Sequence, residues 1–213
     1  MKPRKTPLIE NGIVVGTGSD KYETKNPVAR YLLKTFDQAV AELAASVSPK
    51  AILEVGCGEG HITQVLLDHT QAKIHATDLS PTIIDIARGQ LNSPRVTFEA
   101  KNIADLSSDQ HTAPLVVCCE VLEHLEDPAQ GLAKLAELAR PYALMSVPRE
   151  PLWRILNFLR GAHVKNWGNS PGHIQHWSKK AFLNFVAREF ELIEIRSPLP
   201  WTITLGRSKR CRS

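Results

Sequence analysis

The stretch ILEVGCGEGH, residues 52–61, decides the fold of this chain. An apolar run, AILEV, ends in a loop with glycines at 56, 58 and 60, and the helical pattern HITQVLLDH follows directly. Glycine lets the backbone turn sharply and approach a ligand closely, because it has no Cβ. In an open α/β sheet, the loop after the first strand is where ligands bind. We therefore expect Gly56, Gly58 and Gly60 to form a ligand-binding turn between a strand and a helix.

Outward from this loop, short apolar runs alternate with amphipathic helical patterns. This alternation predicts parallel strands with helices on both faces, and the last two runs can add an antiparallel end. The expected fold class is α/β: a doubly wound, mostly parallel seven-stranded sheet with a lid insertion after the fifth strand. After AILEV, the runs are KIHATD, RVTFEA, PLVVCCE, YALMSVP, ELIEIRS and WTITLGR.

Chain length and the alternation of strand and helix patterns indicate the domain organisation. A chain of 213 residues suits one domain, which we place at residues 27–213 after an N-terminal arm at 1–26. Residues 149–177 are too long for a plain connection and are expected to form a lid or substrate insertion. Within them, 151–161 has apolar residues at helical spacing. It can cover an apolar substrate, contact a membrane surface peripherally or pack on the domain itself.

Composition limits the classes of function. The formal net charge is +4, and no basic stripe is interleaved with aromatic residues, so we do not expect nucleic acid as the main partner, although the sequence does not exclude it. No run of 18 apolar residues is present, and the opening segment lacks the apolar middle of a secretory signal. The four cysteines have no disulfide-like pattern, which favours a reduced, cytoplasmic location. The oligomeric state is not predicted.

The loop does not match the common nucleotide motifs. His61 stands where the dinucleotide fingerprint needs its third glycine, and the chain has no Gly-Lys-Ser/Thr of a P-loop. Asp78 ends the second strand, and a carboxylate there can accept both hydroxyls of a ribose. Glu54 is unusual inside an apolar strand and can face a positively charged ligand group. Taken singly, Asp78 can be a helix cap and Glu54 a satisfied polar group, but their order and spacing favour a ligand site.

Three motifs carry a resemblance to a known family. LEVGCGEG at 53–60, TDLSP at 77–81 and VCCEVLEHLEDP at 117–128 resemble those of class I S-adenosylmethionine-dependent methyltransferases, over roughly residues 27–147. The resemblance implies that the glycine loop holds the methionine end of S-adenosylmethionine and that Asp78 holds the ribose. It also implies that Asn102 meets the adenine amine, with Ile103 and Leu79 on the two faces of the ring. The cofactor-binding residues so implied are Glu54, Gly56, Gly58, Gly60, Asp78, Leu79, Asn102, Ile103 and Glu120.

The motif Glu120-x-x-Glu123-His124 has two interpretations. On one turn of helix, residues i, i+3 and i+4 share a face, so the three side chains can converge on a divalent ion such as Mg²⁺, Mn²⁺, Fe²⁺ or Co²⁺. His173 and His176 can supply a further ligand, and the metal would lower the pKa of a substrate hydroxyl. Alternatively, the motif only starts a helix and shapes the pocket. Without a metal, His124 and then His176 are the candidate general bases.

Finer resemblances suggest the acceptor. EVLEHL resembles the ubiquinone-pathway O-methyltransferases, whereas Glu-x-x-Glu-His with a distal histidine resembles the metal-dependent 2′-O-methyltransferases of small-RNA 3′ ends. We expect an S-adenosylmethionine-dependent methyltransferase acting on oxygen of a small, partly apolar molecule. The alternatives are a metal-assisted RNA 2′-O-methyltransferase and a non-catalytic S-adenosylmethionine-binding regulatory or partner protein.

Overall fold

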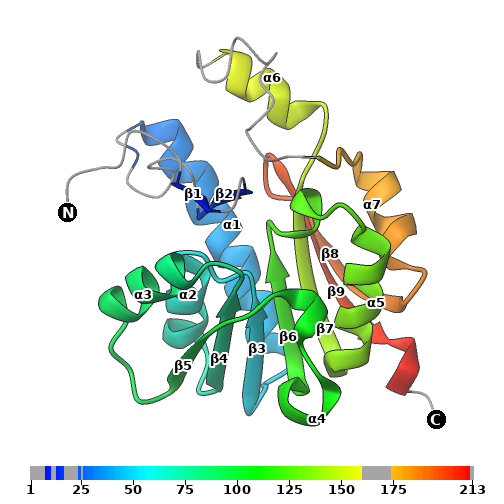
Figure 1. The fold of residues 1–213 in the computed structure, drawn as a ribbon. Coiled ribbons are helices and arrows are strands. Elements are labelled where there is room, and N and C mark those ends of the chain that lie inside the picture. Colours follow the sequence, from blue (N-terminus) through cyan, green and yellow to red (C-terminus); the bar gives the residue numbers. More distant parts are fainter. Residues whose placement is uncertain (1–7, 11–12, 17–23, 25, 160–173, 212–213) are drawn as a thin grey trace.

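A seven-stranded sheet forms the centre of the computed structural model, which describes residues 8–10, 13–16, 24, 26–159 and 174–211 (Figure 1). The strand order is β5-β4-β3-β6-β7-β9-β8. β3 to β7 are parallel to one another, and β9 is antiparallel to both β7 and β8. The prediction of a doubly wound, mostly parallel sheet is confirmed. The strands are β3 (Ala51–Val55), β4 (Lys73–Asp78), β5 (Val96–Ala100), β6 (Ala113–Cys119), β7 (Ala139–Pro148), β8 (Phe190–Arg196) and β9 (Trp201–Ser208).

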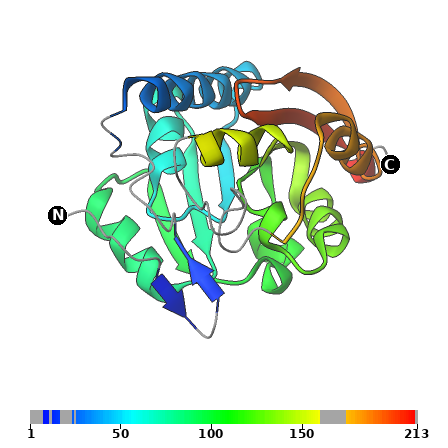
Figure 2. The ribbon, with the colours of Figure 1, turned by 90° about the horizontal axis from the view of Figure 1, so that it is seen from above.

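Helices cover both faces of this sheet (Figure 2). On one face, α1 (Pro27–Ser46), α2 (His61–His69) and α3 (Pro81–Gln90) bury a core in which Phe36 and Leu66 pack with Ile74. On the other face, α5 (Pro128–Leu138) and α7 (Lys179–Val186) bury a second core that includes Leu132 and Val116. Alternate residues of β3, β6 and β7 serve the two cores, as their near-continuous apolar runs require.

Local sequence signals fix where the helices begin. The side chains of Asn26, Ser80, Asp127 and Ser178 each accept a hydrogen bond from a backbone N–H of the first turn of α1, α3, α5 and α7. The first three are each followed by proline, which suits the first helical position because its missing N–H would have no partner there. Asn26 and Ser178 thus begin α1 and α7 as side-chain caps.

Shorter elements complete the described part of the chain. Within the arm, β1 (Leu8–Glu10) and β2 (Ile13–Val15) form an antiparallel hairpin that the sequence did not predict. In the expected lid, α6 (Leu152–Leu159) is helical, and the ring of Trp153 lies 5.7 Å from that of Trp201. None of the helices described is long and apolar enough to cross a membrane. The remaining elements are η1 (Ile103–Asp105), α4 (Ser108–His111), η2 (Leu122–His124) and η4 (Lys209–Cys211).

Candidate active site

The glycine loop follows β3 at the point where the strand order reverses, between β4 and β6. Gly56, Gly58 and Gly60 have φ values of 77°, 54° and 92°, a region that other residues rarely adopt. A Cβ on Gly56 would overlap the side chain of Val121, and one on Gly60 would lie 2.7 Å from Cδ1 of Leu91. A Cβ on Gly58 would meet nothing within 4 Å. The first and third glycines therefore permit packing, whereas Gly58 leaves space for a ligand.

Asp78 is fixed beside this space by two backbone donors. Its Oδ2 accepts a hydrogen bond from Gly58 N and its Oδ1 accepts one from Ser80 N, both at 3.0 Å. Burial raises the pKa of the Asp78 carboxyl, and these two hydrogen bonds oppose the rise. Each oxygen keeps a second lone pair that can accept from a ligand hydroxyl. The next residue, Leu79, is 46% exposed at the same edge of the sheet.

Glu54 lies under the loop and is almost completely buried. Its Oε2 accepts a hydrogen bond of 2.6 Å from the hydroxyl of Thr63 on α2. Burial, with a smaller contribution from the negative charge of Asp78, raises the pKa of Glu54 to about 8 although the Thr63 bond opposes it. The carboxyl is therefore mostly protonated at neutral pH unless a cation comes close.

Glu54 should make the stability of the ligand-free protein fall as pH rises. Because its folded pKa of about 8 lies above its unfolded value of 4.5, the native state binds the additional proton between these two values. Stability from this group is complete below pH 4.5 and is lost as pH rises through 8. Urea unfolding at pH 5.5 and 8.5 should show a loss of up to roughly 4 kcal/mol in wild type that is absent in Glu54→Gln. Parallel pH profiles of the two proteins would contradict this assignment.

Glu120 is held at the end of β6 in an uncommon conformation. Its φ is 60°, and its N–H donates to the carbonyl of Ser146 on β7. Its Oε2 accepts a 2.8 Å hydrogen bond from the indole of Trp201, whose ring packs against that of Phe36 at 4.7 Å. Trp201 follows Glu120 by 81 residues, and no local signal in the sequence indicates their contact.

The rest of the motif differs from the expected turn of α-helix. Leu122–His124 form a single 3-10 turn, and Glu123 is 1% exposed whereas His124 is exposed. The spacing is therefore not that of the expected α-helical turn, because a 3-10 turn follows Glu120 in its left-handed conformation. The proposed metal ligands Glu120, Glu123 and His124 are not among the groups of three close ligand atoms within the described ranges.

Ile174 and Gln175, which follow the residues outside the described ranges, lie close to this 3-10 turn. Ile174 N and Gln175 N both donate to the carbonyl of Glu123, at 2.9 and 3.0 Å. Nδ1 of the next residue, His176, lies 3.7 Å from Oε1 of Glu150. His173 lies outside the described residues. The backbone of Ile174 and Gln175 therefore lies against the motif, while a metal held there with His176 stays a prediction.

Asp78, at the end of β4, and Asn102, just after the end of β5, lie at the same edge of the sheet. Lys101 N donates to the carbonyl of Asp78 at 2.7 Å. Oδ1 of Asn102 accepts from Ala104 N at 2.9 Å and so caps η1, a role that the sequence did not predict. One lone pair of this oxygen is used for the cap, which leaves the other for an adenine amine. Ile103 packs against the second core beneath.

Acidic groups surround the glycine loop. The negative charges of Glu59 and Glu10 act on Asp78, in addition to its burial. Glu10 belongs to the hairpin, and hydrogen bonds from Thr82 and Ser80 lower its pKa, so the hairpin reaches the start of α3. A site with this surplus of carboxylates favours a positively charged ligand.

Comparison with known proteins finds sequence similarity over the part of the chain that contains this site. Residues 53–145 match the family model of a methyltransferase domain. The ubiquinone biosynthesis O-methyltransferase of Coxiella burnetii is 29% identical over 118 residues, which are 54% of this chain and 47% of that protein. The chain thus spans about half the length of this relative.

Solved structures agree on the fold. The N-methyltransferase NodS from Bradyrhizobium japonicum WM9, in complex with S-adenosyl-l-homocysteine, has a TM-score of 0.67 at 17% identity, covering 88% of this chain and 91% of NodS. The magnesium protoporphyrin IX methyltransferase from Synechocystis PCC 6803 has a TM-score of 0.65 at 18% identity, covering 89% and 94%. The matched stretch contains the glycine loop and Asp78, so over residues 53–145 this chain is similar to S-adenosylmethionine-dependent methyltransferases, and the solved structures share its fold.

Proposed function

We propose that the chain binds S-adenosylmethionine at the carboxyl edge of β3 and β4 and transfers its methyl group to an oxygen of a small, partly apolar molecule. The observation that supports this best is the fixed carboxylate of Asp78 beside the open space at Gly58. The cofactor carries an ammonium and a sulfonium, which suit the acidic surroundings of the loop. Oxygen as the acceptor is inferred from the Coxiella relative named above.

In this proposal the cofactor lies along the strand ends. The ribose hydroxyls donate to Asp78, and the methionine ammonium lies near Glu54, where a positive charge would favour the ionised carboxylate. The adenine ring lies between Leu79 and Ile103, with its amine toward Asn102. Glu120, fixed by Trp201, forms the floor beneath the sulfonium.

The transfer step needs alignment more than covalent chemistry. A substrate oxygen attacks the methyl carbon in line with the sulfur, so that an O–C bond forms, the S–C bond breaks and S-adenosylhomocysteine leaves. A general base takes the hydroxyl proton, and we assign His124, whose side chain is exposed next to the cofactor floor, before His176. Glu150 can orient His176 as the second candidate.

We do not extend the proposal to metal-assisted transfer onto RNA. That alternative needs Glu120, Glu123 and His124 to bind one divalent ion, with a further ligand from His173 or His176. Methyl transfer that continues at full rate in excess chelator would remove a metal from the reaction. Loss of turnover on chelation, with recovery on adding Mn²⁺ or Mg²⁺, would instead support the metal site.

The general-base assignment gives a separate prediction. With an acceptor in hand, His124→Gln should lower kcat by about 10²–10⁴-fold, the usual contribution of general base catalysis, with little change in cofactor affinity. His176→Gln should have the smaller effect. His69→Gln is a matched control, because that imidazole bonds only to the carbonyl of Val65 within α2. Equal activities of His124→Gln and the control would remove His124 from the reaction.

Two measurements test the proposed function. Calorimetry should show binding of S-adenosylmethionine and S-adenosylhomocysteine at one site per chain. Labelled cofactor should then give methyl transfer to at least one member of a panel of alkyl-substituted catechols, carboxylates, lipids and short RNAs. Transfer to a catechol hydroxyl supports the proposal, and transfer to RNA supports the alternative acceptor. Tight cofactor binding without any transfer would favour a regulatory or partner protein.

A further inference from the structure

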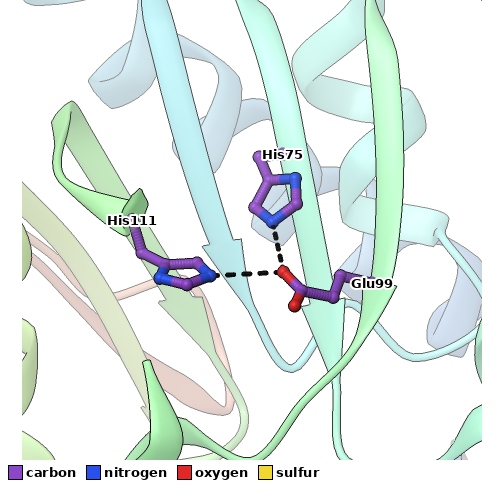
Figure 3. A group of neighbouring side chains, drawn as sticks. All are labelled: His75, Glu99 and His111. Carbon is purple, nitrogen blue, oxygen red and sulfur yellow. Dashed lines mark hydrogen bonds and ion pairs between the residues drawn. The ribbon is translucent and has the colours of Figure 1, made fainter. Parts of the chain in front are cut away.

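Three metal-ligating side chains meet on a part of the sheet that the proposed methyl transfer does not use. Nε2 of His75 lies 3.0 Å and Nε2 of His111 lies 3.2 Å from the same oxygen, Oε2 of Glu99. Figure 3 shows both imidazole rings directed at this one carboxylate from two different elements. Over the described ranges of the chain, this is the only set of three such residues whose ligand atoms all lie within 4.8 Å of one another.

We propose that His75, Glu99 and His111 form a binding site for a divalent transition-metal ion, with Zn²⁺ the ion that best suits the ligand set. Two imidazoles and one carboxylate are a recognised ligand set for Zn²⁺, with a water or another small ligand in the fourth position. For tetrahedral bonds of about 2.0–2.1 Å, neighbouring ligand atoms lie roughly 3.3 Å apart. The separations of 3.0 and 3.2 Å from Glu99 Oε2 are close to this, and all three ligand atoms lie within 4.8 Å of one another.

The strands explain why these residues come together. Ile74 and Ala76 belong to the core under α1 and α2, so His75 between them points to the opposite face of β4. In the parallel register, His75 pairs with Thr97, and Glu99 follows two residues later on the same face of β5. His111 ends α4, which has only four residues, so this face of β4 and β5 has a thin cover.

Each histidine also has an outer partner that fixes its ring. Nδ1 of His75 lies 2.8 Å from the hydroxyl of Thr97, and Nδ1 of His111 lies 3.1 Å from both the backbone N–H and the carbonyl of Ser107. Without an ion, each Nε2–H donates to Glu99, since an ionised carboxylate only accepts. With an ion bound, each ring would carry its proton on Nδ1, toward Thr97 Oγ1 or the Ser107 carbonyl, and offer its Nε2 lone pair to the metal, the arrangement that metal-binding histidines commonly show. Lys101 contacts Oε1 of Glu99 at 3.0 Å and so leaves Oε2 to the ion.

The site has an entry path and an open side. A cavity of about 350 Å³ at the amino-terminal ends of the strands is lined by His75, Thr97 and His111, together with Arg95 and Gln110. Water or a small anion in this cavity can occupy the fourth coordination position. A bound ion would join β4, β5 and α4. It would thereby fix the segment between Glu99 and His111, which carries Asn102 and Ile103 at the cofactor edge.

Metal titration of the full chain tests this proposal. Chelator-treated protein should take up one Zn²⁺ at this site in competition with a chromophoric chelator. Co²⁺ should give the visible absorption of a tetrahedral ion, and Zn²⁺ should raise Tm. His75→Gln and Glu99→Gln should each weaken binding by more than the roughly 100-fold that loss of an outer partner costs. Lys101→Met should tighten it, because an adjacent ammonium opposes a cation.

Controls separate this site from others. His69→Gln should bind like wild type, since its imidazole bonds to the carbonyl of Val65 within α2. His75 is partly exposed, so His75→Gln decides the result even if the buried His111→Gln does not fold. The proposal is overturned if wild type binds no Zn²⁺, or if His75→Gln keeps wild-type affinity. Loss of the metal in His124→Gln but not in His75→Gln would place the ion at the methyl-transfer site instead.

Discussion

Asp78→Ala should lower the affinity for S-adenosylmethionine by about 10²–10³-fold, since two hydrogen bonds to a charged group are lost at 1.5–3 kcal/mol each and part of this is recovered by water. The carboxylate is already oriented by Gly58 N and Ser80 N, so it binds ribose without further ordering. Asp78→Asn keeps an oxygen that can accept from one of these donors and should lose less. Calorimetry with S-adenosylhomocysteine measures the same contact without turnover.

The control for Asp78→Ala must report on the fold. Removing Asp78 also takes the acceptor from two backbone N–H groups, so circular dichroism and Tm should accompany each titration. Asp85→Ala is a matched surface change, because Asp85 on α3 is largely exposed and pairs only with Arg88. It should leave cofactor affinity unchanged. A folded Asp78→Ala protein with affinity within threefold of wild type would remove the ribose role.

Much of the fold could be predicted from the spacing of apolar residues along the chain. The alternation of apolar runs and helical patterns predicted the sheet, because these signals act over a few neighbouring residues. The hairpin β1–β2 was not predicted, since three-residue strands in a polar arm give too short a pattern.

Some parts of the candidate site could be predicted from the sequence, and others could not. Gly56, Gly58, Gly60 and Asp78 lie at one edge because they follow adjacent strands, which a parallel sheet requires. The contact between Glu120 and Trp201 depends on how β9 inserts beside β7, and no local pattern encodes it. The cluster of His75, Glu99 and His111 depends on the register of β4 against β5. A shift of one residue there would put Glu99 on the other face.

Gly58→Val should separate ligand binding from folding. In the ligand-free protein a Cβ on Gly58 meets nothing within 4 Å, so the cost of the change to stability is that of the left-handed backbone, about 1–2 kcal/mol. In the proposed complex the same space holds the cofactor, and the added side chain would occupy it. We expect no measurable binding at concentrations more than about 100 times the wild-type Kd, with only a modest fall in Tm.

Gly56→Ala supplies the contrast. Its Cβ would overlap Val121 at the start of the η2 segment, so the added methyl group should destabilise the protein before any ligand is present. Val121→Ala should restore part of that stability to Gly56→Ala, but should not restore binding to Gly58→Val. If Gly58→Val binds S-adenosylmethionine as wild type does, the open space at Gly58 is not the cofactor site. Equal losses of Tm in Gly58→Val and Gly56→Ala would mean that all positions of the loop serve packing alone.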